Sequence, residues 1–131
     1  MGVFRRFLAW LCGKPKSIGE CGEVLACKFI GKRGYSLVTR NWSFGHGEID
    51  IIAKDKDILV FIEVRLRNRD ASVRGYESIS RHKKSVLRRT CIAYLKKHGS
   101  VLTHRFDVID IEHDYATNTD TIHHYENVPL F

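Results

Sequence analysis

The sequence has no membrane-spanning segment and no recognisable cysteine motif. Its longest apolar runs are far shorter than the roughly 20 residues that a transmembrane helix needs. The four cysteines (Cys12, Cys21, Cys27 and Cys91) contain no Cys-x-x-Cys pair and have no regular spacing. This pattern favours reduced, mostly buried thiols in a cytoplasmic protein over a zinc site.

The N-terminus lacks a complete targeting signal. Its apolar run after Arg6 is six residues long, and no small-residue cleavage site follows it. Position 6 is not the Ser or Thr that myristoylation of Gly2 requires. We expect residues 1–17 to form an N-terminal arm and linker, with reversible contact with a membrane or a partner as the alternative. The remaining residues, 18–131, are enough for one domain with a sizeable core.

The positive charge is concentrated in one segment. The whole chain carries a net charge of +7, but residues 65–97 contain eleven Lys or Arg and two acidic residues, a net +9. The rest of the chain has eleven basic and thirteen acidic residues, a net −2. Such a distribution is typical of a protein with a polyanionic partner, most simply nucleic acid. A solvated basic helix face is the alternative.

Periodicity predicts an α/β fold with a central mixed sheet of four to five strands flanked by helices. A helix is expected to begin at Gly19 and to stop near Gly34. A second helix is expected from an N-cap at Ser80 to about Lys97, with Gly99 just beyond it. The expected strands cover residues 35–42, 47–53, 58–65, 105–112 and 121–125.

Asp50 and Glu63 stand out because they lie within apolar strands. A buried carboxylate is costly unless hydrogen bonds, a cation or a metal ion compensate it. If the turn between the two strands is centred between residues 55 and 56, opposed residue numbers sum to 111. Glu48, Asp50, Glu63 and Arg65 would then project from one face of the sheet. Carboxylates so placed are suited to Mg²⁺, which binds substrate phosphate and activates water in phosphodiester cleavage.

Several ordered motifs stand out along the chain: Gly-x-x-Gly-Glu at 19–23, Gly34-Tyr35, Arg40-Asn41-Trp42, Gly47-Glu48-Ile49-Asp50, Phe61-Ile62-Glu63-Val64 and Arg105-Phe106-Asp107. With these motifs the chain resembles the uncharacterised YraN-like bacterial family between about Ile18 and Ile111. That family is similar in fold to restriction-endonuclease-like nucleases and archaeal Holliday junction resolvases. The resemblance implies a restriction-endonuclease-like sandwich over residues 18–131, a nuclease-like domain.

The resemblance also implies a PD-(D/E)xK-type catalytic site. Asp50 and Glu63 would bind Mg²⁺ or Mn²⁺ together with the backbone carbonyl of Val64. Glu23, on the first helix, would orient water or a second ion, and Arg65 would occupy the position of the family's usual lysine. Nucleic-acid contacts are expected from a set of basic residues that follows the site: Arg67, Arg69, Arg74, Lys83, Lys84 and Arg88.

The leading hypothesis is therefore a metal-dependent, structure-selective DNA endonuclease acting in DNA repair or recombination. Arginine stays protonated, so Arg65 could hold a phosphate but could not accept a proton as lysine can. The alternative is a nucleic-acid-binding module with a weak or inactive site. DNA, including branched DNA, is the expected partner, and a homodimer is expected by analogy with the resolvases. No integral membrane segment and no small-molecule cofactor are expected.

Each of two further acids and one lysine has an expected role and an alternative. Glu48 is expected to make a structural hydrogen bond or salt bridge in preference to a metal bond. Asp107 is expected to pair with Arg105 or to cap its strand. Lys83 is a candidate phosphate contact, with a solvated lysine as the alternative.

Overall fold

The computed structural model describes residues 18–69, 77, 79–99 and 103–131. The predicted arm at residues 1–17 lies outside this range, so the division into arm and domain stays a prediction. Within the described residues, no helix is long and apolar enough to span a membrane. The elements are α2 (Ile18–Lys32), β1 (Ser36–Phe44), β2 (Gly47–Asp55), β3 (Ile58–Asn68), α3 (Arg81–His98), β4 (His104–Asp114) and β5 (Thr119–Tyr125).

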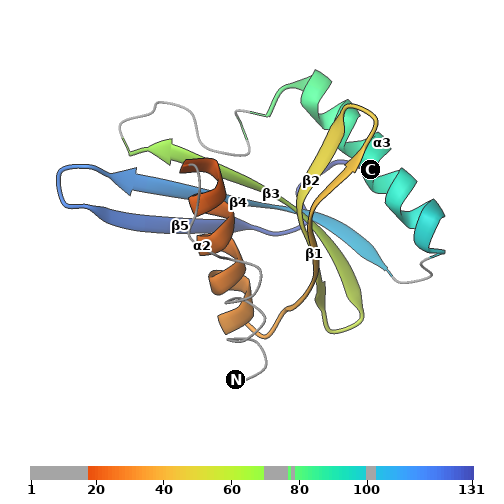
Figure 1. Cartoon of the computed structure of the whole chain (residues 1–131), viewed down its shortest axis with the longest axis horizontal. Coiled ribbons are helices and arrows are strands. Elements are labelled where there is room, and N and C mark those ends of the chain that lie inside the picture. Colours follow the sequence, from red (N-terminus) through yellow and green to blue (C-terminus); the bar gives the residue numbers. More distant parts are fainter. Residues whose placement is uncertain (1–17, 70–76, 78, 100–102) are drawn as a thin grey trace.

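The five strands form one mixed sheet in the order β1-β2-β3-β4-β5 (Figure 1). Among the described strands, β3 and β4 are the one parallel pair, and α3 lies in the crossover between them. The other neighbouring pairs are antiparallel. The predicted α/β sandwich with a mixed sheet is confirmed, and it has the layering expected for the restriction-endonuclease-like class.

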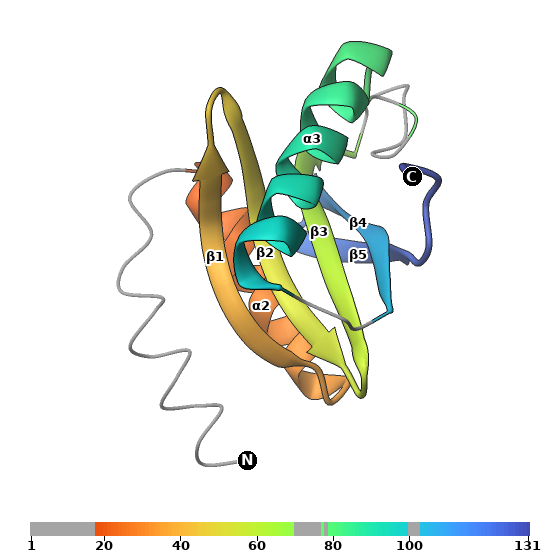
Figure 2. The ribbon, with the colours of Figure 1, turned by 90° about the vertical axis from the view of Figure 1, so that its right-hand side faces the viewer.

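Helices α2 and α3 cover opposite faces of the sheet, with α3 in front and α2 behind in Figure 2. On the α2 side, Cys27 and Ile30 pack with Ile51 and Ile62 in one buried cluster. On the α3 side, a second cluster joins Leu87, Cys91 and Tyr94 to residues of β2, β3 and β4. Both faces of the central strands are therefore buried, which explains why these strands read as nearly continuous apolar runs.

Local signals fix the ends of α3 as predicted. The Ser80 side chain accepts a hydrogen bond from the backbone N–H of Lys83, at 3.1 Å, and so caps the first turn. Gly99 has the left-handed backbone (φ 56°) that ends many helices, and its N–H donates to the carbonyl of Leu95. This capping places Lys83 in the first turn of α3.

The register of the β2–β3 hairpin differs from the predicted one. The turn consists of Lys56, whose φ is 54°, and Asp57, and the ladder runs from Asp55↔Ile58 to Ile51↔Ile62. Opposed residue numbers therefore sum to 113, and the predicted sum of 111 is wrong. The turn lies one residue further along because Lys56 adopts the left-handed conformation. An even difference in the sum leaves the alternation of side chains unchanged within this ladder, which covers residues 51–55 and 58–62.

The end of the chain is part of the fold. The N–H of Val128 donates to the carbonyl of Phe106, at 2.7 Å, so residues after β5 lie along β4. Asp107 is fully buried and accepts hydrogen bonds from Arg105, at 3.0 Å, and from the backbone N–H of Asn127, at 2.9 Å. The predicted pairing of Asp107 with Arg105 is confirmed, and His124 adds a further contact at 2.8 Å.

Candidate metal centre

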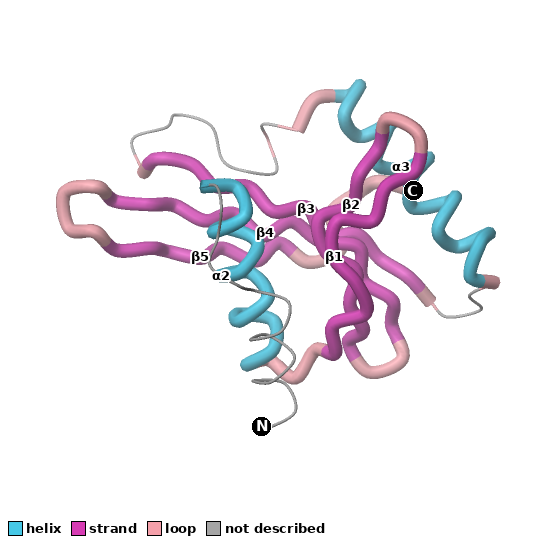
Figure 3. Tube along the Cα trace, in the orientation of Figure 1, coloured by secondary structure: helices cyan, strands magenta, loops and turns pink. Residues whose placement is uncertain are grey.

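Asp50 and Glu63 lie where β2 and β3 separate. The ladder between the two strands ends at Ile51↔Ile62, and the two acids are the next residues beyond it. Figure 3 shows the start of β2 and the end of β3 running in different directions past this point. Oδ2 of Asp50 accepts a hydrogen bond from the N–H of Val64, at 2.8 Å. A side chain thus satisfies a backbone donor that the ladder no longer pairs.

The regular alternation of β2 side chains between the two faces of the sheet is interrupted at Asp50. Ile49 belongs to the buried cluster on the α3 side, whereas Ile51 belongs to the cluster on the α2 side. In a regular strand, alternate residues share a face, so the strand must be irregular between them. Asp50 accordingly reaches Val64 of β3 and lies in one carboxylate group with Glu23 of α2.

Burial disfavours the charged form of both carboxylates, and a hydrogen bond between them raises the pKa of Asp50 while it lowers that of Glu63. Burial, followed by the charge of Glu63, raises the pKa of Asp50 to about 8, although the hydrogen bond from Val64 opposes the shift. Glu63 is only 4% exposed, and its burial raises its pKa although the charge of Lys83 opposes that shift. Within the described part of the chain, Oε2 of Glu63 is buried and has no hydrogen-bond donor. A buried acceptor without a donor costs about 1–3 kcal/mol.

Two cations approach the other oxygen of Glu63. Nζ of Lys83 lies 3.7 Å from Oε1, and Nη1 of Arg65 lies 3.9 Å from the same atom. Arg65 comes from β3, two residues after Glu63, whereas Lys83 comes from the first turn of α3. The sequence predicted Lys83 as a contact to the nucleic-acid backbone, and the structure places it beside a candidate metal ligand.

A second group of carboxylates shares Asp50. Glu23 of α2, Glu48 and Asp50 each offer one oxygen atom within 4.8 Å of the others, an arrangement that could hold a metal ion. Glu48 therefore lies closer to the site than the structural role assigned to it from sequence would suggest. Nη2 of Arg40 donates to Oε2 of Glu23, at 2.8 Å, and both side chains are largely buried.

Arg40 is the site residue that sequence reasoning missed. It lies on β1 directly opposite Ile51, and its guanidinium fixes Glu23 beside the carboxylates of β2. The available signal was an arginine at a partly buried strand position near a helix with one inward-reaching glutamate. That signal becomes specific only when the pairing of β1 with β2 is known.

Several of the predicted nucleic-acid contacts form internal ion pairs. The Nε atom of Arg67 donates to both oxygens of the buried Asp110, at 2.9 and 3.0 Å, and Nη2 donates to Glu112. Arg69 donates to Asp114 at 2.9 Å. Burial and these pairs leave Arg67 with little free charge for DNA. Arg74 lies outside the described residues, and Lys84 and Arg88 lie on α3.

The donor set fits a hard divalent cation. Mg²⁺ and Mn²⁺ prefer carboxylate and carbonyl oxygens, and Glu23 of α2 joins the exposed Glu48 and Asp50 of β2 in a group of carboxylates that could hold such an ion. The oxygen of Glu63 that lacks a donor is the atom that a cation would satisfy best. A group of acidic residues that could bind a metal ion is thus present, and its cost without one is visible in the raised pKa of Asp50.

The fold and the site define an α/β-sandwich protein with a candidate divalent-metal centre between two separating strands. The chain belongs to the uncharacterised protein family UPF0102, whose profile matches residues 22–111, from α2 to β4. The resemblance seen in the sequence motifs is thereby confirmed.

Relatives in several bacteria carry the same family name. A UPF0102 protein of Pelotomaculum thermopropionicum is 37% identical over 113 residues, covering 86% of this chain and 94% of the relative. One from Desulfosudis oleivorans is 40% identical over 103 residues, covering 78% and 84%. One from Coxiella burnetii is 36% identical over 101 residues, covering 76% and 84%. The match therefore includes most of each relative's length.

Proposed function

We propose that this protein is a metal-dependent, structure-selective DNA endonuclease of the PD-(D/E)xK type that acts in DNA repair or recombination. The observation that carries the proposal is the pair formed by Asp50 and Glu63. Glu63 is buried and Asp50 is partly buried, and both have raised pKa values. With one oxygen of Glu63 lacking a donor, this pair is costly for stability alone. Cations at the rim of the same pair are what a phosphodiester substrate requires.

Asp50 and Glu63 would hold Mg²⁺ or Mn²⁺ together with the backbone carbonyl of Val64. The ion supplies Lewis-acid stabilisation of the phosphate and acidifies water when it is bound. Glu23 would orient the water molecule, and Arg40 keeps its carboxylate in place. Oδ2 of Asp50 stays fixed by the N–H of Val64, so one ligand is preorganised before substrate arrives.

Arg65 and Lys83 would both supply positive charge that stabilises the scissile phosphate. The Arg65 side chain is 36% exposed and the Lys83 side chain 42% exposed, so both can turn from Glu63 to a phosphate. An arginine can bind two phosphate oxygens at once, whereas an ammonium acts as a point charge. Lys83 of α3 thus places an ammonium group beside Arg65, which occupies the position of the family's usual lysine.

A nucleic-acid-binding module with little or no cleavage is the second candidate. It is favoured by the arginine at position 65 and by the engagement of Glu23 with Arg40, which occupies one oxygen of a candidate catalytic group. Both candidates predict DNA binding that weakens steeply with salt. They differ in their dependence on metal.

The deciding experiment incubates branched, single-stranded and duplex DNA with Mg²⁺ or Mn²⁺ and compares the wild type with Asp50→Asn. Cleavage should depend on the metal and should fall by more than about 100-fold in the variant, since removing a direct ligand should cost at least as much as disturbing an outer partner. Cleavage that survives Asp50→Asn would point to a contaminating nuclease. Absence of cleavage on every substrate would favour the binding module.

The two cations can be separated with matched variants. Lys83→Ala should lower the cleavage rate more than Lys97→Ala, in the last turn of the same helix, because of these two described lysines Lys83 alone contacts Glu63. If Arg65 limits cleavage, Arg65→Lys should raise the rate. Equal effects of the two lysine variants would assign Lys83 to general DNA binding instead. A homodimer and a cytoplasmic location remain part of the proposal, and size-exclusion chromatography with light scattering tests the first.

A further inference from the structure

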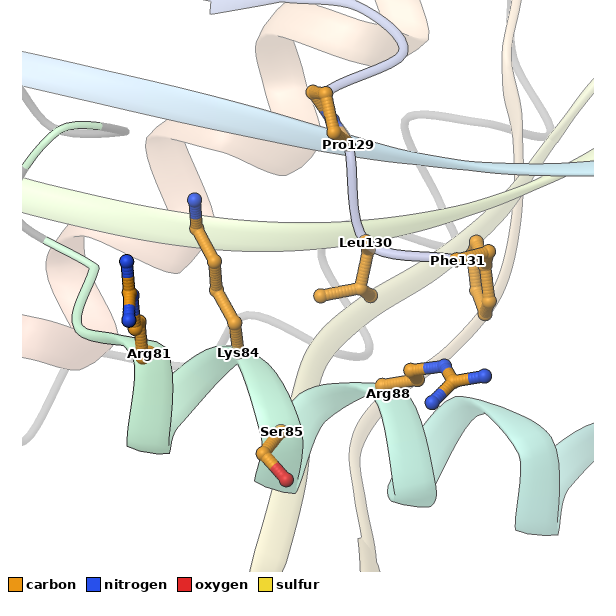
Figure 4. Close-up of a pocket in the computed structure, with 7 residues that line it drawn as sticks. All are labelled: Arg81, Lys84, Ser85, Arg88, Pro129, Leu130 and Phe131. Atoms are coloured by element: carbon orange, nitrogen blue, oxygen red, sulfur yellow. The ribbon is translucent and has the colours of Figure 1, made fainter.

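A groove lies between α3 and the segment after β5 (Figure 4), and neither Asp50 nor Glu63 lines it. Its volume is about 350 Å³. The residues that line it come from one flank of α3 and from the segment after β5: Arg81, Lys84, Ser85, Arg88, Pro129, Leu130 and Phe131. Helix and C-terminal segment thus form two different walls, one charged and one apolar.

The α3 wall is strongly basic. Arg81, Lys84 and Arg88 are spaced at i, i+3 and i+7, so they lie along one side of the helix over about 10 Å. None of the described residues that line the groove is acidic. Arg67 and Arg69, by contrast, are paired with acids of β4. The groove therefore has the charge to bind an extended anion.

The opposite wall offers an exposed aromatic ring. Phe131 is 52% exposed, and its ring is held by edge contact with the ring of His104, with centroids 4.7 Å apart. Figure 4 shows the Phe131 ring and the Arg88 guanidinium at the same end of the groove. An aromatic ring beside a row of cations is the combination on which single-stranded nucleic acids stack their bases.

We infer that this groove binds a single-stranded segment of DNA, with phosphates on Arg81, Lys84 and Arg88 and one unstacked base on Phe131. Duplex DNA keeps its bases stacked inside the helix, so it could use the cations but not the ring. The inference rests on the proposed function in taking DNA as the anion. It adds a site: α3 also carries Lys83, so a strand in the groove follows the helix that reaches the carboxylate pair.

The test measures binding of fluorescently labelled oligothymidylate and of a duplex of equal length by anisotropy, in EDTA so that no cleavage occurs. Phe131→Ala should weaken single-strand binding about tenfold and duplex binding less than about twofold. Phe131→Trp should restore single-strand binding, which separates stacking from a fault in folding. Tyr115→Ala, an exposed ring in the β4–β5 turn, is the aromatic control.

Adjacent arginines provide the charge control. Arg88→Ala should reduce the salt dependence of single-strand binding by about 0.7 in the logarithmic slope, and Arg89→Ala, outside the groove, should change it less. Equal losses for single strand and duplex in Phe131→Ala, or equal effects of the two arginine variants, would overturn the inference. So would competition by polyglutamate as strong as that by oligothymidylate.

Failure of this site and failure of the proposed nuclease are distinguishable. Selective single-strand binding without metal-dependent cleavage would support the groove and refute the enzyme. Metal-dependent cleavage with no change of single-strand preference in Phe131→Ala would support the enzyme and refute the groove.

Discussion

Replacing Asp50 by Asn should make the metal-free protein more stable at neutral and alkaline pH. The pKa of Asp50 in the folded chain is about 8, above the ordinary value of 3.8 that it regains on unfolding. Between these values the folded chain holds a proton that the unfolded chain has lost. The free energy of unfolding therefore falls as pH rises from about 4 to about 8, by up to about 1.4 kcal/mol per pH unit for one proton. Asparagine has no such proton, and its side-chain oxygen can still accept the N–H of Val64.

The assay is urea denaturation in EDTA at pH 5, 6, 7 and 8, followed by circular dichroism. The wild type should lose stability relative to Asp50→Asn over this range, by at most about 4 kcal/mol in total. Asp57→Asn, at an exposed position of the hairpin turn, is the matched control. A difference between wild type and Asp50→Asn that stays constant, or that grows in favour of the wild type with rising pH, would refute the reasoning about the carboxylate pair.

Two further predictions concern the stability of the fold: one tests the buried Asp107 network and the other the packing of α3 on β2. Burial raises the pKa of Asp107, but hydrogen bonds from His124 and Arg105 outweigh it and hold the pKa below its ordinary value, so this contribution to stability should be lost as pH falls into the acid range. Asp107→Asn should cost about 3 kcal/mol in urea denaturation at pH 7, and an unchanged midpoint would contradict the network. A Cβ at Gly47 would lie 1.9 Å from Oγ1 of Thr90, so Gly47→Ala should lower stability by about 1–3 kcal/mol. Gly22→Ala, whose Cβ would meet its nearest neighbour at an ordinary 3.4 Å, should be neutral or stabilising, and equal melting temperatures for the two variants would contradict the packing of α3 on β2.

Most of the fold could be predicted because its signals are local. The serine cap and the following glycine mark α3 to within a residue, and apolar runs locate every strand. Two strands are longer than predicted: β1 continues to Phe44 and β3 to Asn68. Backbone pairing with β2 and β4 extends these strands beyond their apolar runs. The predicted register of the hairpin was wrong because the observed register depends on the left-handed backbone of Lys56, which no apolar pattern encodes.

The site could be predicted in part. Asp50 and Glu63 could be predicted as site residues because a carboxylate within an apolar strand is costly unless another group compensates it. The structure brings the two side chains together. Partners from other elements were not visible: Arg40 reaches Glu23 across the sheet, and Arg67 reaches Asp110 from the neighbouring parallel strand. Charge counting predicted a basic DNA-binding segment, but it could not tell which arginines find acids within the protein.

Direct titration of a divalent cation tests the central claim most closely. Mn²⁺ is added to the protein and its free concentration is followed by electron paramagnetic resonance, comparing wild type, Glu63→Gln and Glu77→Gln. The wild type and Glu77→Gln should bind Mn²⁺ with equal affinity, and Glu63→Gln should bind at least about tenfold more weakly. Equal affinities in all three proteins, or no binding to the wild type, would contradict a metal centre at Asp50 and Glu63.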